Sequence, residues 1–371
     1  MLRVLLASLA LALTPAVHAQ GVTDNSIVIG QSAPLSGPAA QLGVDINFGA
    51  NLYFYEVNRR GGINGRKIRL RVLDDGYEPQ RTVANTKRLI DEDKVFALFG
   101  YIGAPTSEAA LPIASAAGVP FLSPFTGAES LRNYNRFLFN TRASYYDETE
   151  AIVRHLTTLG LTRIAAFYED DESGQGGLAG VERALKQRKL ELVARGTVER
   201  NGIDVARAVR DITAAKPQAV VMMAAYTGSV AFIREMQKQD VAPSLWNVSF
   251  VGSQVLAREL DESGRGVQVS QVVPFPWDTN LGVVREYQKV LAEVKGEPGF
   301  GSLEGYIAAR ALVEGLRRVG PQPTRENFIK AMETLRNYDM GGYSVSFGPN
   351  DHNGSRFVDL TMITREQRFL R

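Results

Sequence analysis

Two groups of carboxylates come closest to a catalytic arrangement in this sequence. Asp74 and Asp75 follow one predicted strand, and Asp170, Asp171 and Glu172 follow another. Paired carboxylates can act as acid and base in glycoside hydrolysis, or can bind a divalent metal. Adjacent residues of an extended chain point to opposite sides, however, and acids at strand ends often cap helices or face solvent. We therefore expect capping and turn positions here, with a glycosidase or metal site as the less favoured alternative.

Other side chains used in catalysis are scarce. The 371 residues contain no Cys and three His, at positions 18, 155 and 352. The lack of Cys excludes disulfides, thiolate zinc sites, iron–sulfur ligation and a cysteine nucleophile. We predict His155 on a helix face and His352 in an exposed turn, an arrangement that offers no Ser-His-Asp triad. No Walker A or Rossmann motif is present, since Gly174-Gln-Gly-Gly177 has the wrong spacing. We expect a protein that is not an enzyme and that uses neither a cofactor nor a metal.

The charge balance argues against nucleic acid as a partner. Lys and Arg number 42 against 40 Asp and Glu, which gives a formal net charge of +2. A protein that follows a phosphate backbone needs a marked basic surface. The length predicts about two domains at roughly 150 residues each.

The first residues, 1–19, are predicted to be a secretory signal peptide. Arg3 precedes an apolar run from Val4 to Leu13, and Val17-His18-Ala19 fits a signal-peptidase site. A membrane anchor is the alternative, but the run is shorter than the roughly 20 residues that span a bilayer. We expect cleavage before Gln20, export to the periplasm and a monomeric mature protein without a lipid anchor.

From Ile27 onward, short β-branched runs alternate with amphipathic stretches of helical period. This alternation predicts an α/β fold with parallel sheets covered by helices on both faces. Two such runs, separated near residues 140–147, predict two doubly wound lobes. We expect one lobe to hold residues 22–140 and 273–342, and the other to hold residues 141–272 and 343–371.

Several short motifs, taken in their order along the chain, resemble those of a known protein family. They are residues 29–43 (IGQSAPLSGPAAQLG), 58–65 (NRRGGING), 118–124 (GVPFLSP), 168–171 (YEDD) and the glycine-bounded segment 341–354. Together they resemble the periplasmic leucine/isoleucine/valine-binding family along essentially the whole mature chain. The resemblance implies a type I periplasmic binding protein, with two lobes, three hinge crossings and a solute in the cleft. Such proteins deliver amino acids or related solutes to an inner-membrane ABC permease. A ligand-sensing regulator or receptor module on the same fold is the alternative, which the signal peptide disfavours for a cytoplasmic regulator.

Ligands of doubly wound sheets bind beyond the carboxyl ends of the strands. At such positions the resemblance implies a set of ligand-binding residues from both lobes. In the first lobe and the first crossing they are Leu42, Tyr101, Ala104, Thr106, Phe125, Thr126, Gly127 and Arg142; across the cleft they are Tyr145, Ser173, Tyr226 and Phe250. Packing in a core or on the surface is the alternative for each aromatic residue.

The expected ligand carries a carboxylate or a carbonyl group. Backbone N–H groups between Tyr101 and Ser107, at the start of a predicted helix, suit such a group. Thr126 adds a hydroxyl donor, whereas Ala104 stands where the family usually has a hydroxyl. The family also has an acid for the ligand ammonium near Phe250, and this chain has none there. A ligand without an amino group is therefore expected to be tolerated.

The role of Arg142 stays open at this point. Its guanidinium group suits a bidentate contact with a ligand carboxylate. Pairing with a nearby acid such as Asp147 is an equal alternative.

Overall fold

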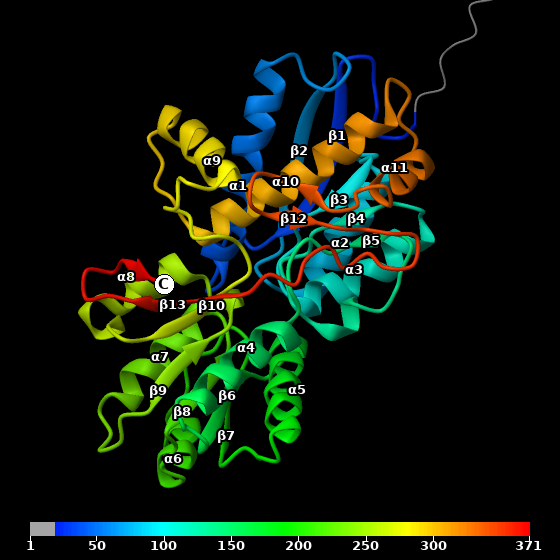
Figure 1. Cartoon of the computed structure of the whole chain (residues 1–371). Helices are drawn as coiled ribbons and strands as arrows, with labels where there is room; N and C mark the ends of the chain where they lie inside the picture. Colours follow the sequence, from blue (N-terminus) through cyan, green and yellow to red (C-terminus); the bar gives the residue numbers. More distant parts are fainter. Residues whose placement is uncertain (1–18) are drawn as a thin grey trace, which may run out of the picture.

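The computed structural model describes residues 19–371, which form two lobes, each built on its own sheet (Figure 1). The expected signal peptide, residues 1–19, lies almost entirely outside the described residues. Among the described residues, no helix has the length and apolar character needed to cross a membrane.

The first lobe contains a five-stranded parallel sheet with the order β2-β1-β3-β4-β5. Ile29 of β1 lies opposite Leu70 of β2 and Ala97 of β3. The strands are β1 (Ser26–Ala33), β2 (Lys67–Asp74), β3 (Ala97–Phe99), β4 (Phe121–Leu122) and β5 (Leu138–Phe139). The helices between them are α1 (Ala40–Arg59), α2 (Pro79–Asp91), α3 (Ala104–Ala116) and η1 (Glu129–Leu131). Pro79 begins α2 as expected, because proline fits the first helical turn.

The second lobe repeats this topology. Its parallel strands run β7-β6-β8-β9-β10, and two antiparallel strands extend the β10 edge. The strands are β6 (Ile164–Glu169), β7 (Arg195–Val198), β8 (Ala219–Met223), β9 (Ser244–Asn247), β10 (Gln268–Gln271), β13 (Asp359–Ile363) and β14 (Phe369–Leu370). The helices are α4 (Tyr145–Thr158), α5 (Glu172–Gln187), α6 (Ala206–Ala214), α7 (Tyr226–Met236), η2 (Ser249–Val251), α8 (Ser253–Leu260) and η3 (Asp261–Gly264). The expected α/β class with two doubly wound lobes is confirmed.

The C-terminal third returns to the first lobe before it ends in the second. It adds α9 (Gly282–Glu293), α10 (Phe300–Val319) and α11 (Arg325–Met332), followed by the paired strands β11 (Tyr338–Asp339) and β12 (Ser344–Val345). Helix α10 packs closely along α1, since a Cβ on Gly49 would lie only 1.8 Å from the Ser302 carbonyl oxygen. The chain thus passes between the lobes three times: after β5, after β10 and before β13.

The last passage comes later along the chain than the expected residue 343. Strand β12 pairs with β11, and Phe347 packs on Phe139 of the first sheet, with ring centroids 5.4 Å apart. Asn353 still bridges to Asn140 at the end of β5. The chain therefore joins the second sheet only at β13.

The two histidines within the described residues take structural positions. His155 lies on α4 with its ring 5.2 Å from that of Trp246, in line with the expected helix face. His352 is 3% exposed and stacks on Phe139 at 3.8 Å, so the expectation of an exposed turn is wrong at this residue. The turn that contains His352 packs against β5, and this contact buries the imidazole ring.

Candidate functional site

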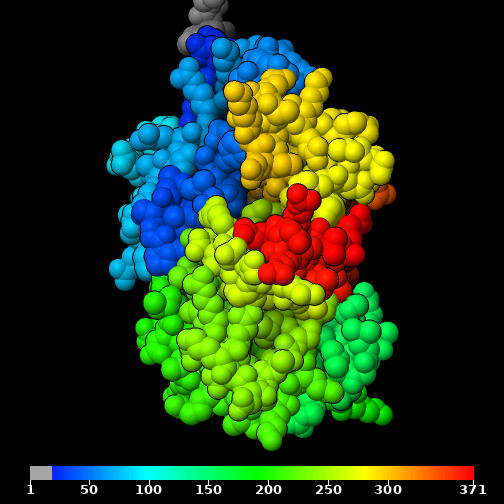
Figure 2. Space-filling model, turned by 90° about the vertical axis from the view of Figure 1, so that its left-hand side faces the viewer, coloured from blue at the N-terminus to red at the C-terminus, as the bar shows by residue number. Residues whose placement is uncertain are grey.

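The two lobes meet at the carboxyl ends of their parallel strands. In each sheet the strand order reverses beside the lobe's first strand, between β1 and β3 and between β6 and β8. Ligands of such sheets bind at this switch point. Figure 2 shows the two lobes in direct contact, with the C-terminal segment in red at their junction.

Tyr77 is the centre of the contact between the lobes. Its hydroxyl donates a hydrogen bond to Asp171 Oδ2 at 2.9 Å and lies 3.3 Å from Ser173 Oγ. The Ala104 N–H, at the start of α3, donates to the same Ser173 Oγ at 3.0 Å. Gly103 has φ +85°, and a Cβ there would lie 2.4 Å from the Tyr77 ring, so glycine is required. A loop of each lobe is thereby held against the other.

Two buried acids of the second lobe, Asp171 and Glu169, belong to this region. Asp171 Oδ1 accepts the Gly174 N–H at 2.9 Å and so caps α5, as expected of this acidic run. Glu169 accepts the N–H groups of Asn201 at 2.7 Å and Ala225 at 3.2 Å. Burial raises the pKa of Asp171, and burial followed by the neighbouring Asp171 raises the pKa of Glu169 to about 7. Both carboxylates would gain from a nearby cation.

Arg200 of the second lobe forms one of the ion pairs between the lobes. It pairs with Glu78 of the first lobe at 3.3 Å, so it is already engaged with a different acid. Asp171 has no ion-pair partner among residues 19–371.

An apolar group of side chains lies beside Tyr77. Phe250 packs 6.1 Å from the Tyr77 ring and 5.9 Å from the Phe125 ring. Leu42 reaches across from α1, because a Cβ on Gly252 would lie 2.5 Å from its Cδ2. All of these side chains are buried. The contact therefore has an apolar side and a polar side.

The loop after β4 joins the first crossing. Thr126 Oγ1 donates to the Tyr145 hydroxyl at 3.3 Å, and the Gly127 carbonyl accepts the Tyr145 N–H at 2.7 Å. A Cβ on Gly127 would lie 2.5 Å from the Tyr145 ring, so this approach depends on glycine. Burial raises the pKa of Tyr145 to about 12, and the phenol remains protonated.

Arg142 is buried and pairs with two acids from different lobes. Its guanidinium lies 3.3 Å from Glu148 of α4 and 3.3 Å from Glu304 of α10, and over the Phe125 ring at 4.7 Å. It also donates to Ser249 Oγ. Burial raises the pKa of Glu304 to about 7, against the opposing effect of Arg142. Asp147, named as one alternative partner, instead accepts hydrogen bonds from the Ser144 N–H and hydroxyl in the capping box of α4.

Two expected site residues point elsewhere. The Tyr101 ring packs 4.8 Å from Phe121 in the first-lobe core, and its hydroxyl lies 3.1 Å from that of Thr86. Gly100, the residue before it, has φ +63°, a backbone conformation that favours glycine. The Thr106 hydroxyl donates to the Ile102 and Gly103 carbonyls of its own loop. Tyr101 is therefore wrong as a cleft side chain, and the Thr106 hydroxyl closes the first turn of α3.

Tyr226 opens α7 directly after β8 and is half-buried. The next residue, Thr227, donates to the Pro38 carbonyl of the first lobe at 2.7 Å. Tyr226 thus lies at the edge of the contact between the lobes.

Sequence reasoning missed four residues of this region: Tyr77, Glu148, Asp171 as a cleft acid, and Glu304. A weak signal existed for Glu304, because it is the one charged residue within the otherwise uncharged stretch 303–309. Tyr77 had none, since it stands in a polar turn between Asp75 and Pro79.

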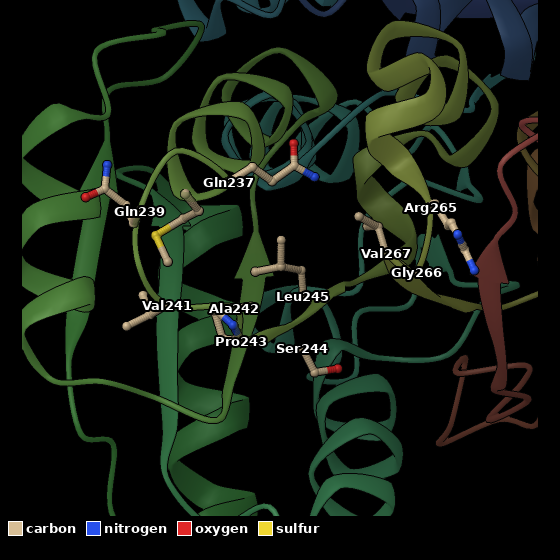
Figure 3. A pocket seen from close by; sticks show the side chains of 11 residues that line it. Gln237, Gln239, Val241, Ala242, Pro243, Ser244, Leu245, Arg265, Gly266 and Val267 are labelled. Carbon is tan, nitrogen blue, oxygen red and sulfur yellow. The ribbon is translucent and has the colours of Figure 1, made fainter.

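A separate surface pocket of about 260 Å³ lies at the opposite end of the second sheet (Figure 3). It is lined by Ser244 and Leu245 at the start of β9, by Val267 before β10 and by Gln237 after α7. The amino ends of parallel strands are not the ligand end of a doubly wound sheet. This pocket is therefore not the counterpart of the inter-lobe site.

Comparisons with known proteins agree with this geometry. A family model described as periplasmic binding protein matches residues 26–367. The Leu/Ile/Val-binding protein homolog 7 of Brucella abortus is 27% identical, over 91% of this chain and 90% of the relative.

Solved structures are similar over nearly the whole chain. A possible leucine/isoleucine/valine-binding protein from Rhodopirellula baltica has a TM-score of 0.88 and 34% identity, covering 94% of this chain and 97% of that one. A substrate-binding periplasmic protein from Ralstonia solanacearum has a TM-score of 0.88 and 33% identity, covering 93% and 99%.

The family resemblance noted in the sequence is thereby confirmed. Members of this family are solute-binding proteins rather than enzymes, and they act in the periplasm. Both lobes, both switch points and the contact between them occur here in one chain matched from β1 to the last strands. This chain belongs to the periplasmic binding protein family and is similar throughout to its leucine/isoleucine/valine-binding members.

Proposed function

We propose that this protein is the solute-binding subunit of an ABC importer and captures a small amino acid, or a related carboxylate or amide, between its lobes. The observation that carries the proposal is the hydrogen bond from the Ala104 N–H to Ser173 Oγ at 3.0 Å. A solute that enters here exchanges its own polar groups for this direct contact between the lobes. Binding then favours closure, because the closed state alone offers groups from both sides.

The carboxylate end of the solute lies against the first lobe. The N-terminus of α3 offers the Ala104 N–H and the positive end of the helix dipole. Gly103 has no side chain to block the approach, and Thr126 adds a hydroxyl. These groups favour an anion or a carbonyl oxygen.

The amino or amide nitrogen of the solute lies near Asp171. The lack of an acid beside Phe250 favours a ligand without an amino group, but Asp171 supplies a buried carboxylate from another strand. A buried acid whose pKa is raised gains most from a cationic or N–H donating partner. We therefore favour an amino acid or an amide over a simple carboxylic acid.

The side chain of the solute packs against Leu42, Phe125 and Phe250. Buried apolar surface of this kind favours an aliphatic or aromatic group. The names of the relatives, which cite leucine, isoleucine and valine, support the aliphatic choice.

The proposal also includes the cellular location of the protein and its partner. Residues 1–19 are removed on export, the mature chain is a periplasmic monomer, and an inner-membrane ABC permease receives the solute. No cofactor, metal, nucleic acid or chemical step is part of this function.

A thermal-shift screen of residues 20–371 against amino acids, their amides and organic acids tests the proposal. We expect saturable stabilisation by an amino acid or amide with an apolar side chain. Tyr226→Ala should weaken the binding of that solute by about 1–3 kcal/mol, and Tyr55→Ala, an exposed position 51% accessible on α1, should not. Equal affinity in both variants would remove Tyr226 from the site, and a screen without any hit would contradict the proposed class of solute.

A further inference from the structure

A polar cavity of about 330 Å³ lies on the first lobe, away from the contact between the lobes. Its walls are the C-terminal half of α1, the stretch 306–317 of α10 and one face of α9, helices that lie together in Figure 1. Helix α1 runs from Leu42 at the inter-lobe site to Tyr53 and Val57 at the cavity. At about 1.5 Å per residue, more than roughly 15 Å of helix separates the two places.

The floor of the cavity holds polar groups that lack partners. Tyr306 is 1% exposed and lines the cavity, and its hydroxyl has no hydrogen bond to any of residues 19–371. Arg310 Nε is buried and likewise has no acceptor in the described chain. Buried donors without acceptors are costly, so this floor favours a ligand that accepts hydrogen bonds.

The walls of the cavity carry more positive than negative charge. Two of its cations are already paired, Arg60 with Glu56 and Arg310 with Glu286. The other two, Lys289 and Arg317, are in no ion pair within the described residues, although Arg317 has a hydrogen bond with the Tyr53 side chain. The site thus has a surplus of two positive charges.

The tyrosines act as hydrogen-bond donors. Burial raises the pKa of Tyr306 and of Tyr53, although Arg317 and Arg310 oppose the shift at Tyr53. Both phenols are therefore protonated at neutral pH. Tyr338 adds a third hydroxyl at the edge, beside Arg310.

We propose that this cavity binds a small oxyanion of the phosphate or sulfate class, free or as the ester of a small organic group. A tetrahedral oxyanion accepts hydrogen bonds from several directions, which matches guanidinium groups and phenols arranged around one space. The volume equals that of about ten water molecules, which leaves room beyond a single anion. This site is independent of the solute in the inter-lobe cleft.

Calorimetric titration with inorganic phosphate, sulfate and glycerol phosphate, at constant ionic strength made up with chloride, tests the proposal. A saturable signal is required, because phosphate and sulfate stabilise many proteins non-specifically by exclusion from their surface. A tighter fit of glycerol phosphate identifies an ester as the ligand, and equal or tighter binding of the inorganic ions identifies a free anion; both support the site.

Two variants and one control locate the binding. Arg317→Gln should weaken phosphate binding tenfold or more, and Tyr306→Phe should weaken it several-fold. Arg69→Gln removes the same charge from an exposed position on β2 and should leave binding unchanged. The unfolding temperature and the affinity for the inter-lobe solute serve as controls for folding in each variant. Equal binding by Arg317→Gln and Arg69→Gln, or no saturable heat up to about 10 mM of any of the three anions, would overturn the proposal.

Discussion

The Tyr77 hydroxyl of the first lobe donates a 2.9 Å hydrogen bond to the Asp171 carboxylate of the second. Both side chains are buried, and the pKa of each is raised by that burial. A neutral phenol and a carboxylate thus hold the lobes together at the place where the solute is proposed to bind. This pair ties the closed arrangement to the chemistry of the solute.

Removing the Tyr77 hydroxyl should loosen the closed arrangement. Tyr77→Phe leaves Asp171 without its donor from the other lobe, at a cost of about 1–3 kcal/mol to the closed state. Small-angle scattering without ligand should then give a larger radius of gyration than for the unchanged protein. Tyr101→Phe is the matched control, because its hydroxyl lies near Thr86 within one lobe. A similar change of radius in both variants would show that the effect is not specific to the inter-lobe bond.

Asp171 should discriminate between solutes with and without an amino group. Asp171→Asn removes the charge but keeps the shape, so affinity for the amino acid should fall about tenfold or more. Affinity for the deaminated acid should stay the same or rise, since no cation is lost. Asp170→Asn, one residue earlier, changes an exposed carboxylate that accepts from Gln175 and should have little effect. Equal losses for both solutes would mean that Asp171 acts only through the capping of α5.

Glu304 should make the stability of the ligand-free protein depend on pH. Its pKa is about 7 in the folded protein against 4.5 as the ordinary value, so the folded state retains the proton to higher pH. This contribution is complete below about pH 4.5 and is lost as the pH rises through 7, a change of about 1–3 kcal/mol.

The measurement is urea unfolding between pH 5 and 7.5. Glu304→Gln mimics the protonated form, so its free energy of unfolding should fall less as the pH rises. Glu169, whose pKa is also raised, still contributes part of the fall. Glu297→Gln, an exposed acid before α10, should retain the full decline. A decline that is unchanged in Glu304→Gln would contradict the raised pKa.

Gly103 should be sensitive to substitution for two reasons. A Cβ at this position meets the Tyr77 ring at 2.4 Å, and φ is +85°. Gly118 has φ +63° but nothing within 4 Å of its Cβ position. Its substitution therefore measures the cost of the positive φ alone, without a steric clash. Gly118→Ala should cost about 1 kcal/mol of unfolding free energy, and Gly103→Ala clearly more, together with a loss of solute affinity. Equal costs and intact affinity would show that Tyr77 moves aside freely.

Local patterns in the sequence predict much of this fold and only part of the site. The alternation of apolar strands and amphipathic helices is a property of neighbouring residues, so two lobes with parallel sheets could be inferred, but not the order of the strands. The rule for doubly wound sheets directed attention to the loops after the strands. The family resemblance then implied Leu42, Thr126 and Phe250, which lie at the contact between the lobes. Tyr101 instead packs on Phe121 and lies near Thr86, and no local pattern in the sequence specifies these contacts.

Contacts between distant segments were beyond such reasoning. Tyr77 and Asp171 are 94 residues apart and meet only because the lobes close. For Arg142, contact with the ligand and pairing with an acid such as Asp147 were equal alternatives. The capping box of α4 occupies Asp147, and Glu304 reaches Arg142 from the other lobe. Selection among several nearby acids is decided by tertiary packing, which a local pattern does not contain.

The most direct test is a calorimetric comparison of three forms of one solute: the amino acid identified by screening, its methyl ester and its deaminated acid. If the carboxylate lies at the N-terminus of α3 and the amino group lies near Asp171, the ester should bind about 100-fold more weakly and the deaminated acid about tenfold more weakly. An ester that binds as tightly as the free amino acid would contradict the central claim, because the carboxylate would then make no contact with α3.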